Sequence, residues 1–349
     1  MSIVRTVTGD MDPGAVGHVQ PHEHVLSNLS LPPEAHATPS EVTRQRAPIT
    51  LGDYYRIRRE HTAFDLEMTS VDDAIEALRE YRAAGGTTIV DVTSRGMGRD
   101  HLGLRRVAEA TGVAIVMGSG YYYADYHPAH LERLGEREIA DEIVADIVEG
   151  VSGSGIRAGV IGEIGMSWPH TPAEERVLRA AANAQCETGA ALVIHPARHI
   201  ASPRMAVEAA IAAGATPGKI VVSHIERTLF RLDDMRALAE LGCTLSFDLF
   251  GQEMSYYSLG DIDMPNDAGR IRFIRELIAA GHREQILISQ DVCHRTNQRK
   301  YGGEGYTHLL EHVLPQMQRR GLSDQDIVAL TVDNPARLLT IDPNERAAA

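Results

Sequence analysis

The stretch that decides the fold is "AGVIGEIGMSWPHTPAEERVLRAAANAQCETGAALVIHPA", residues 158–197. It begins with one apolar run, 158–165, and ends with another, 191–197, and neither run alternates between apolar and polar residues. Such runs are typical of parallel strands that are buried on both faces. Between the runs, Thr171, Pro172 and Glu174 form the capping signature of a helix start. The stretch therefore predicts a strand–helix–strand unit with parallel strands.

The same alternation recurs along the chain. Helical periodicity occupies 71–84, 202–214 and 271–281, and further apolar runs lie at 17–21, 87–94, 113–120, 219–225, 244–250 and 285–291. About eight strand–helix pairs in succession predict an α/β protein with a single (β/α)₈ TIM barrel over residues 1–349. A doubly wound open sheet is the alternative, but no break in composition divides the chain as two halves. The Pro-rich polar segment 25–69 is expected as a long insertion at the rim after the first strand, and 344–349 as a frayed tail.

Composition excludes several classes of protein. Hydrophobic residues make up 43% of the 349 residues and charged residues 23%, which predicts a sizeable core. The net charge of −14 argues against nucleic acid or an anionic membrane surface as a partner. Three scattered cysteines fit a reducing compartment, and no signal peptide or membrane-spanning run is visible. We therefore expect a cytoplasmic protein that acts on a small molecule.

Side chains able to bind a metal lie where the predicted strands end. The carboxyl ends of the strands of a barrel meet at one mouth, so these residues are expected to come together. A single histidine at a strand end is more often structural, but a whole set indicates a site. The set contains His22, His24, Glu163, His195, His224 and Asp291.

The composition of this set indicates its chemistry. His22 and His24 are two apart on a strand, so they face the same way as a pincer. Histidine and carboxylate without cysteine favour zinc first, with manganese, cobalt or iron as alternatives. Six ligands are too many for one catalytic ion and suit two divalent metal ions with a bridging carboxylate.

The residues resemble a known family along nearly the whole chain, from "TVTGDMDPGAVGHVQPHEH" to "VDNPARLL". The segments "GGTTIVDVTSRGMGRD", "GVIGEIGMSWP", "VVSHIERT" and "RKYGGEGYTHLL" are similar to the phosphotriesterase family of the amidohydrolase superfamily, closest to its phosphotriesterase-related branch. The resemblance implies a homodimer and a binuclear centre. His22, His24 and Asp291 would hold one ion, His195 and His224 the other, and Glu163 would bridge them.

The implied reaction is hydrolysis by a metal-bridging hydroxide that attacks the C=O or P=O group of the substrate. Asp291 would be the catalytic residue that accepts the proton of the nucleophile. No serine or cysteine nucleophile is needed, so a nucleophilic role for Cys293 is set aside.

Candidate substrate-binding residues follow the third, sixth and eighth strands. Tyr122 matches an aromatic position that lines the site in relatives, with rim packing as the alternative. A basic cluster, Arg295, Arg299 and Lys300 with Tyr301, is expected to clamp an anionic group, or else to form a solvated loop.

The chain departs from aryl phosphotriesterases at two positions. Their proton relay would require an acid where Arg227 stands and a histidine where Leu249 stands. We therefore expect cleavage of a small carboxylic ester, lactone or amide. A phosphotriesterase and a non-catalytic ligand-binding barrel are the alternatives. Arg227 is expected to recognise an anion or to pair with Glu226 or Asp248.

Overall fold

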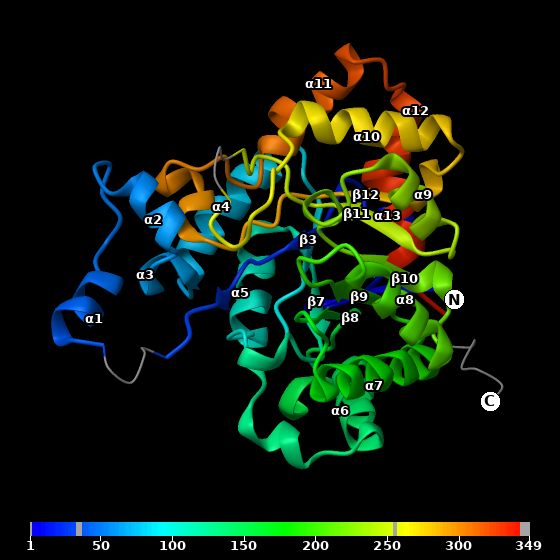
Figure 1. Ribbon diagram of the computed structural model, residues 1–349, viewed down its shortest axis with the longest axis horizontal. Coiled ribbons are helices and arrows are strands. Elements are labelled where there is room, and N and C mark those ends of the chain that lie inside the picture. Colours follow the sequence, from blue (N-terminus) through cyan, green and yellow to red (C-terminus); the bar gives the residue numbers. More distant parts are fainter. Residues whose placement is uncertain (1, 33–36, 254–256, 343–349) are drawn as a thin grey trace.

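The computed structural model describes residues 2–32, 37–253 and 257–342. Within them, eight parallel strands follow one another around a sheet in chain order, and together with the helices outside them they confirm the predicted barrel (Figure 1). The strands are β3 (Val19–Glu23), β6 (Thr88–Asp91), β7 (Ala114–Ser119), β8 (Val160–Gly165), β9 (Ala191–His195), β10 (Ile220–Val222), β11 (Thr244–Phe247) and β12 (Ile286–Ile288).

Glu23 ties the first strand of the barrel to the last. Its Oε1 accepts hydrogen bonds from Ser289 Oγ and the Gln290 N–H, both at 2.8 Å, and its Oε2 accepts from the Val292 N–H at 2.7 Å. The Asp291 N–H also donates to the His22 carbonyl at 3.2 Å. These contacts close the ring, and they bring His22 and Asp291 side by side.

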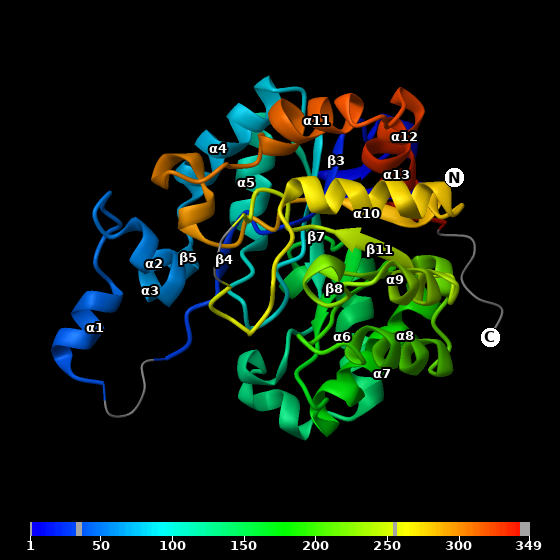
Figure 2. The ribbon, with the colours of Figure 1, turned by 45° about the horizontal axis from the view of Figure 1, so that its top comes forward.

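Helices cover the outside of the strands (Figures 1 and 2). The capping box predicted for residues 171–174 is present, with Thr171 Oγ1 accepting from the Glu174 N–H at 3.2 Å. The helix predicted from 271 begins earlier, at Asp267, because the Asn266 side chain caps the Gly269 N–H. The outer helices are α4 (Val71–Ala83), α5 (His101–Thr111), α6 (Glu136–Val148), α7 (Pro172–Thr188), α8 (Ser202–Ala212), α9 (Leu232–Ala239), α10 (Asp267–Ala279), α11 (Leu314–Arg319), α12 (Asp324–Val328) and α13 (Asn334–Leu339).

The amino-terminal end of the barrel is plugged. Valines from successive strands, such as Val90, Val116 and Val160, form one buried cluster with Val4 and with Leu339 of α13. A three-stranded antiparallel sheet of β1 (Ile3–Thr6), β2 (Gly9–Met11) and β13 (Thr340–Ile341) lies at the same end of the barrel. Since this end is filled, the open end lies where the strands finish.

The segment after β3 leaves the barrel and returns to it. It starts and finishes in a hairpin of β4 (Ser27–Asn28) and β5 (Glu67–Met68), with α1 (Pro39–Gln45), α2 (Tyr54–Glu60) and α3 (Ala63–Leu66) between them. These helices project to one side of the barrel, away from both chain ends (Figure 1). Asp65 of α3 anchors them to the loop after β12, since it accepts from the Thr296 N–H at 2.8 Å.

Two sequence expectations concern the chain ends and membranes. The tail predicted at 344–349 lies outside the described residues. Within the described ranges, no helix combines the length and the apolar composition needed to cross a bilayer.

Candidate metal centre and substrate cavity

The six predicted ligands converge at the open end of the barrel. His22 and the adjoining His24 come from the end of β3, Glu163 from β8 and His195 from the end of β9. His224 and Asp291 lie just beyond β10 and β12. All six are buried, at 9% exposure or less.

Glu163 lies between the four imidazoles. Its Oε2 is 2.7 Å from His195 Nδ1 and 3.6 Å from both His22 Nε2 and His224 Nε2. Its Oε1 is 3.5 Å from His24 Nε2. The two carboxylate oxygens therefore face different histidines, as a bridging ligand requires.

The other acid, Asp291, lies beside two of the imidazoles. Asp291 Oδ1 lies 3.4 Å from His24 Nε2 and 3.8 Å from His22 Nε2. Two groups of ligand atoms within 4.8 Å of one another consist of the six predicted ligands alone: His22, His24 and Asp291, and Glu163, His195 and His224. We call these six residues the cage. His22 and His224 also form such a group with Asp248.

The outer nitrogens of three cage histidines are held by neighbouring side chains. His24 Nδ1 lies 2.8 Å from Thr93 Oγ1, and His224 Nδ1 lies 2.8 Å from Asp248 Oδ1. His22 Nδ1 lies 3.0 Å from Ser223 Oγ. Partners of this kind fix ring orientation and tautomer in metal sites, and here they leave Nε2 of each ring facing inward.

Two cage residues have strained backbones. His224 and Asp291 have φ angles of 54° and 51°, in the left-handed region. Strain of this kind persists where the surroundings impose it, and it clusters at active sites. At His224 the constraint is Asp248, whose Oδ1 accepts from the backbone N–H at 2.8 Å as well as facing the ring.

The charges in and beside the cage come from carboxylates and imidazoles. Glu163, Asp248 and Asp291 are buried against imidazoles, and none of the three forms an ion pair with a lysine or arginine among the described residues. Burial raises the pKa of Glu163, but the neighbouring imidazoles, His195 first, outweigh burial and hold that pKa well below the usual value. Burial lowers the pKa of His224, but the charge of Asp248 outweighs burial and raises it to about 10.

The cage residues fit a pair of divalent metal ions. Two buried atoms aimed into the cage, His22 Nε2 and Asp291 Oδ1, have no hydrogen-bond partner in the part of the chain that the structure describes. A buried polar atom without a partner is costly, and a cation bound between the carboxylates and the imidazoles removes this cost. The donor set of nitrogen and oxygen without thiolate suits zinc, manganese, cobalt or iron.

A cavity of about 200 Å³ opens onto the cage. Its lining includes the cage residues His195, His224 and Asp291, and also Tyr122 and Arg227. Tyr122 Oη lies 3.2 Å from His195 Nε2, and Arg227 Nη2 lies 2.9 Å from the same atom. We call this space the catalytic cavity.

The other predicted substrate-binding residues lie elsewhere. Arg295 donates to the Phe64 carbonyl at 2.8 Å and to Tyr301 Oη at 3.0 Å. Lys300 pairs with Asp73 of α4 at 2.6 Å, and Arg299 pairs with Glu311. None of the four is among the described residues that line the catalytic cavity.

Glu226 and Asp248, the two predicted ion-pair partners of Arg227, are engaged elsewhere. Glu226 pairs with Arg270 at 3.2 Å, and Asp248 orients His224. Arg227 makes no ion pair among the described residues and faces the catalytic cavity. Of the two predicted roles, pairing is therefore wrong.

Cys293 also borders the cavity, but it remains a thiol. Burial, followed by the charges of Asp291 and Glu163, raises its pKa well above the usual value.

Sequence reasoning missed several residues of the site. Asp248 follows β11 and Arg198 follows β9, so the same search of strand ends would have found both. Arg58 lines the cavity from α2. It had no such signal, because nothing in the sequence indicates where an insertion folds back.

Comparison with known proteins agrees with this geometry. The model of the phosphotriesterase family matches residues 2–339. The N-acetyltaurine hydrolase of Homo sapiens is 36% identical over 344 residues, which cover 97% of each chain. A resiniferatoxin-binding protein from Rhodobacter sphaeroides has a similar structure, with a TM-score of 0.90 and 35% identity over 97% of this chain and 94% of the other. A variant of a phosphotriesterase-like lactonase from Deinococcus radiodurans has a TM-score of 0.76 and 27% identity, over 96% of this chain and 99% of that one.

These matches extend over nearly the full length of the chain, and they agree with the barrel and with the groups of metal-ligand side chains at its open end. The chain therefore belongs to the phosphotriesterase family and is a metal-dependent hydrolase.

Proposed function

We propose that this protein hydrolyses the amide bond of a small N-acyl amine that carries an acidic group, with N-acetyltaurine as the reference compound. The cage would hold two divalent metal ions, zinc first among the candidates. The 36% identical human relative, named for N-acetyltaurine hydrolysis, supports the bond type. An unbalanced arginine in the catalytic cavity supports the acidic group.

Arg227 is the observation that carries the proposal. Arg227 is 2% exposed, and among the described residues its guanidinium forms hydrogen bonds only with His195 Nε2 and the Pro196 carbonyl, at 2.9 and 3.2 Å. Within the same ranges its Nη1 has no hydrogen-bond partner. A buried cation without a carboxylate partner is costly. In a chain of net charge −14, such a cation indicates a binding site for an anion.

Two further arginines add positive charge to the same cavity. Arg198 lies at the mouth, donates to Tyr257 Oη at 2.7 Å, and makes no ion pair among the described residues. Arg58 lines the wall from α2 and forms no ion pair with a carboxylate in the described ranges. Burial, followed by the positive charge of Arg198, lowers the pKa of Arg227. A sulfonate or carboxylate near Arg198 and Arg227 would relieve this repulsion and accept several charge-assisted hydrogen bonds.

The cage residues would hold the metal ions, and the residues of the cavity wall would bind the substrate. When bound, two divalent ions would lower the pKa of a water molecule and polarise the amide carbonyl. His22, His24 and Asp291 would hold one ion, His195 and His224 the other, with Glu163 between the two.

Asp291 is the acid placed for proton transfer. It lines the catalytic cavity, whereas Glu163 does not, and their side chains are 13% and 2% exposed. Asp291 would therefore accept a proton from the attacking water and deliver it to the nitrogen of the departing amine.

Tyr122 would orient the substrate. Burial, followed by the charge of Glu163, raises the pKa of Tyr122 well above its usual value, so its O–H remains a donor at neutral pH. A phenol at this position can donate to the amide carbonyl or to the acidic group.

A substrate panel tests the proposal on the metal-loaded protein. N-acetyltaurine is compared with N-ethylacetamide, which has the same amide but no sulfonate, and with a neutral lactone and paraoxon. We expect kcat/KM for N-acetyltaurine to exceed that for N-ethylacetamide by roughly 10- to 150-fold, the value of one hydrogen bond to a charged group. A clear preference for paraoxon or the lactone would contradict the proposal.

A further inference from the structure

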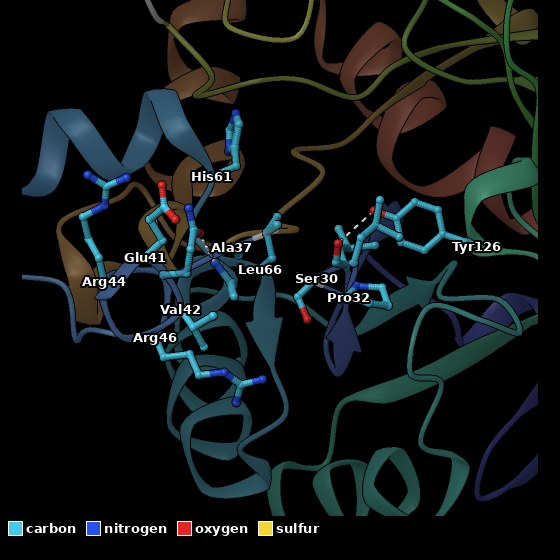
Figure 3. A pocket seen from close by; sticks show the side chains of 14 residues that line it. Ser30, Pro32, Ala37, Glu41, Val42, Arg44, Arg46, His61, Leu66 and Tyr126 are labelled. Atoms are coloured by element: carbon cyan, nitrogen blue, oxygen red, sulfur yellow. Dashed lines mark hydrogen bonds between the residues drawn. The ribbon is translucent and has the colours of Figure 1, made fainter. Parts of the chain in front are cut away.

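A second and larger cavity lies between the insertion and the barrel (Figure 3). It measures about 470 Å³. Leu31, Pro32, Val42 of α1 and Ala63 of α3 supply apolar lining, and the charged side chains Glu41, Arg44 and Arg46 line it as well. Leu31 is 45% exposed. Large apolar side chains that are exposed at a surface often mark a binding site. We call this space the outer cavity.

The outer cavity is continuous with the catalytic cavity. Leu29, His61, Leu66 and Tyr126 line both. Figure 3 shows Leu66 between Val42 on one side and Tyr126 on the other. The Tyr126 hydroxyl is already used, since it donates to the Leu29 carbonyl at 2.8 Å. The junction is therefore apolar at Leu29, Leu66 and the Tyr126 ring and polar at His61, whose Nε2 lies 2.9 Å from Ser258 Oγ and whose Nδ1 has no hydrogen-bond partner among the described residues.

The position of the junction follows from the order of the strands. Leu29 and Leu66 belong to the hairpin region after β3, while Arg198 and Arg227 follow β9 and β10. In an eight-stranded ring ordered β3, β6, β7, β8, β9, β10, β11, β12, strands β3 and β9 are diametrically opposite. The strand ends that lead to Arg198 and Arg227 therefore lie across the barrel from the strand end that leads to Leu29, while Tyr126, on the other wall of the junction, follows β7.

This arrangement matches the two ends of an N-acyl substrate. The acidic group is on the amine side of the amide bond, and the acyl group is on the other side. With the acid held by Arg198 and Arg227 and the amide over the cage, the acyl group points toward Leu29 and Leu66. Together the two cavities reach the roughly 300–1,000 Å³ typical of small-molecule sites, which the catalytic cavity alone does not.

We infer, building on the proposed function, that the outer cavity binds the acyl chain of the substrate, so that the protein cleaves N-acyl aminosulfonates and N-acyl amino acids with chains far longer than acetyl. The occupant is a flexible alkyl chain. Its methylene groups leave water against Leu31, Val42 and Leu66, which favours longer chains.

The test compares N-acetyltaurine with N-octanoyltaurine on the metal-loaded protein. We expect the octanoyl compound to have a kcat/KM at least about tenfold higher in the wild type, because six more methylene groups become buried. Val42→Trp, which fills the outer cavity, should bring this ratio close to one. Leu31→Asp, a change at an exposed position that the fold should tolerate, should do the same. The matched control Val328→Trp, at a residue 45% exposed on α12, should keep the wild-type ratio.

The outcomes separate the inference from the proposed function. A wild-type ratio below one, or an equal ratio in wild type and in both cavity variants, overturns the inference while hydrolysis of N-acetyltaurine sustains the function. If neither compound is hydrolysed, the proposed function fails. The inference is then decided by calorimetry, which measures the affinity of the protein for octanoate and for acetate. A higher affinity for octanoate that Val42→Trp lowers supports the inference. Equal affinities for the two carboxylates overturn it.

Discussion

Replacing Arg227 with methionine should weaken catalysis and stabilise the fold at the same time. The guanidinium is buried, has no carboxylate partner among the described residues and leaves Nη1 unbonded. Replacing buried ionic groups by apolar side chains of similar volume is worth about 1–3 kcal/mol of unfolding free energy. For 349 residues, at about 2.1 cal/mol/K per residue, each kcal/mol shifts Tm by about 1.4 °C. We therefore expect Tm to rise by roughly 1–4 °C.

The same substitution removes the main contact proposed for the acidic group. A hydrogen bond to a charged group is worth about 1.5–3 kcal/mol, so kcat/KM for N-acetyltaurine should fall roughly 10- to 150-fold. The value for N-ethylacetamide should fall far less. Scanning calorimetry and steady-state kinetics at fixed metal concentration measure both effects.

Arg231→Met serves as the matched control, because Arg231 is 74% exposed and its two ion pairs are long, at 3.9 and 4.0 Å. It should change neither Tm nor kcat/KM appreciably. A lower Tm for Arg227→Met, with equal losses on both substrates, would refute the reasoning and give Arg227 a structural role.

Two further predictions concern Asp248 and Asp146. Asp248→Asn should lower metal affinity roughly 10- to 100-fold, because the partner of His224 loses its charge. Competition with a chelator measures this affinity. The control Asp233→Asn, at a side chain that is 75% exposed, should bind metal as tightly as the wild type. Asp146→Asn should cost about 3 kcal/mol of unfolding free energy at pH 7, since the buried carboxylate pairs with Arg95 and Arg99, both at 2.8 Å. Burial opposes ionisation of Asp146, but the charges of Arg99 and Arg95 outweigh it and lower its pKa from the usual 3.8. A carboxyl with a lowered pKa in the folded protein stabilises it above the unfolded pKa and loses that contribution as pH falls. The difference between wild type and variant in urea denaturation should thus be constant from about pH 5 to 8 and shrink below about pH 4; a difference that grows in acid would contradict this assignment.

The barrel and the cage could be predicted from sequence because both depend on local signals. A strand buried on both faces is apolar throughout, so a charged residue such as Glu163 inside the run "GVIGE" stands out. The ring then fixes the positions of all strand ends relative to one another. Residues 22 and 291 are far apart in sequence, yet strand order alone makes them neighbours.

The substrate side could not be predicted in the same way. The basic residues 295–301 follow the last strand, but their charges are taken up by Asp73 and Glu311, acids that only the folded chain brings near. Arg58 reaches the catalytic cavity because the insertion folds back over the barrel mouth. Asp248 was visible in the sequence, but its role depends on whether its carboxylate turns toward His224 or Arg227, which packing decides.

The most direct test of the central claim is anomalous diffraction from crystals of the zinc-loaded protein. Two peaks should lie within the cage, one on the side of His22, His24 and Asp291 and one beside His195 and His224, with the Glu163 carboxylate between them. A single peak away from Glu163, or no peak among these residues at saturating zinc, would contradict the account.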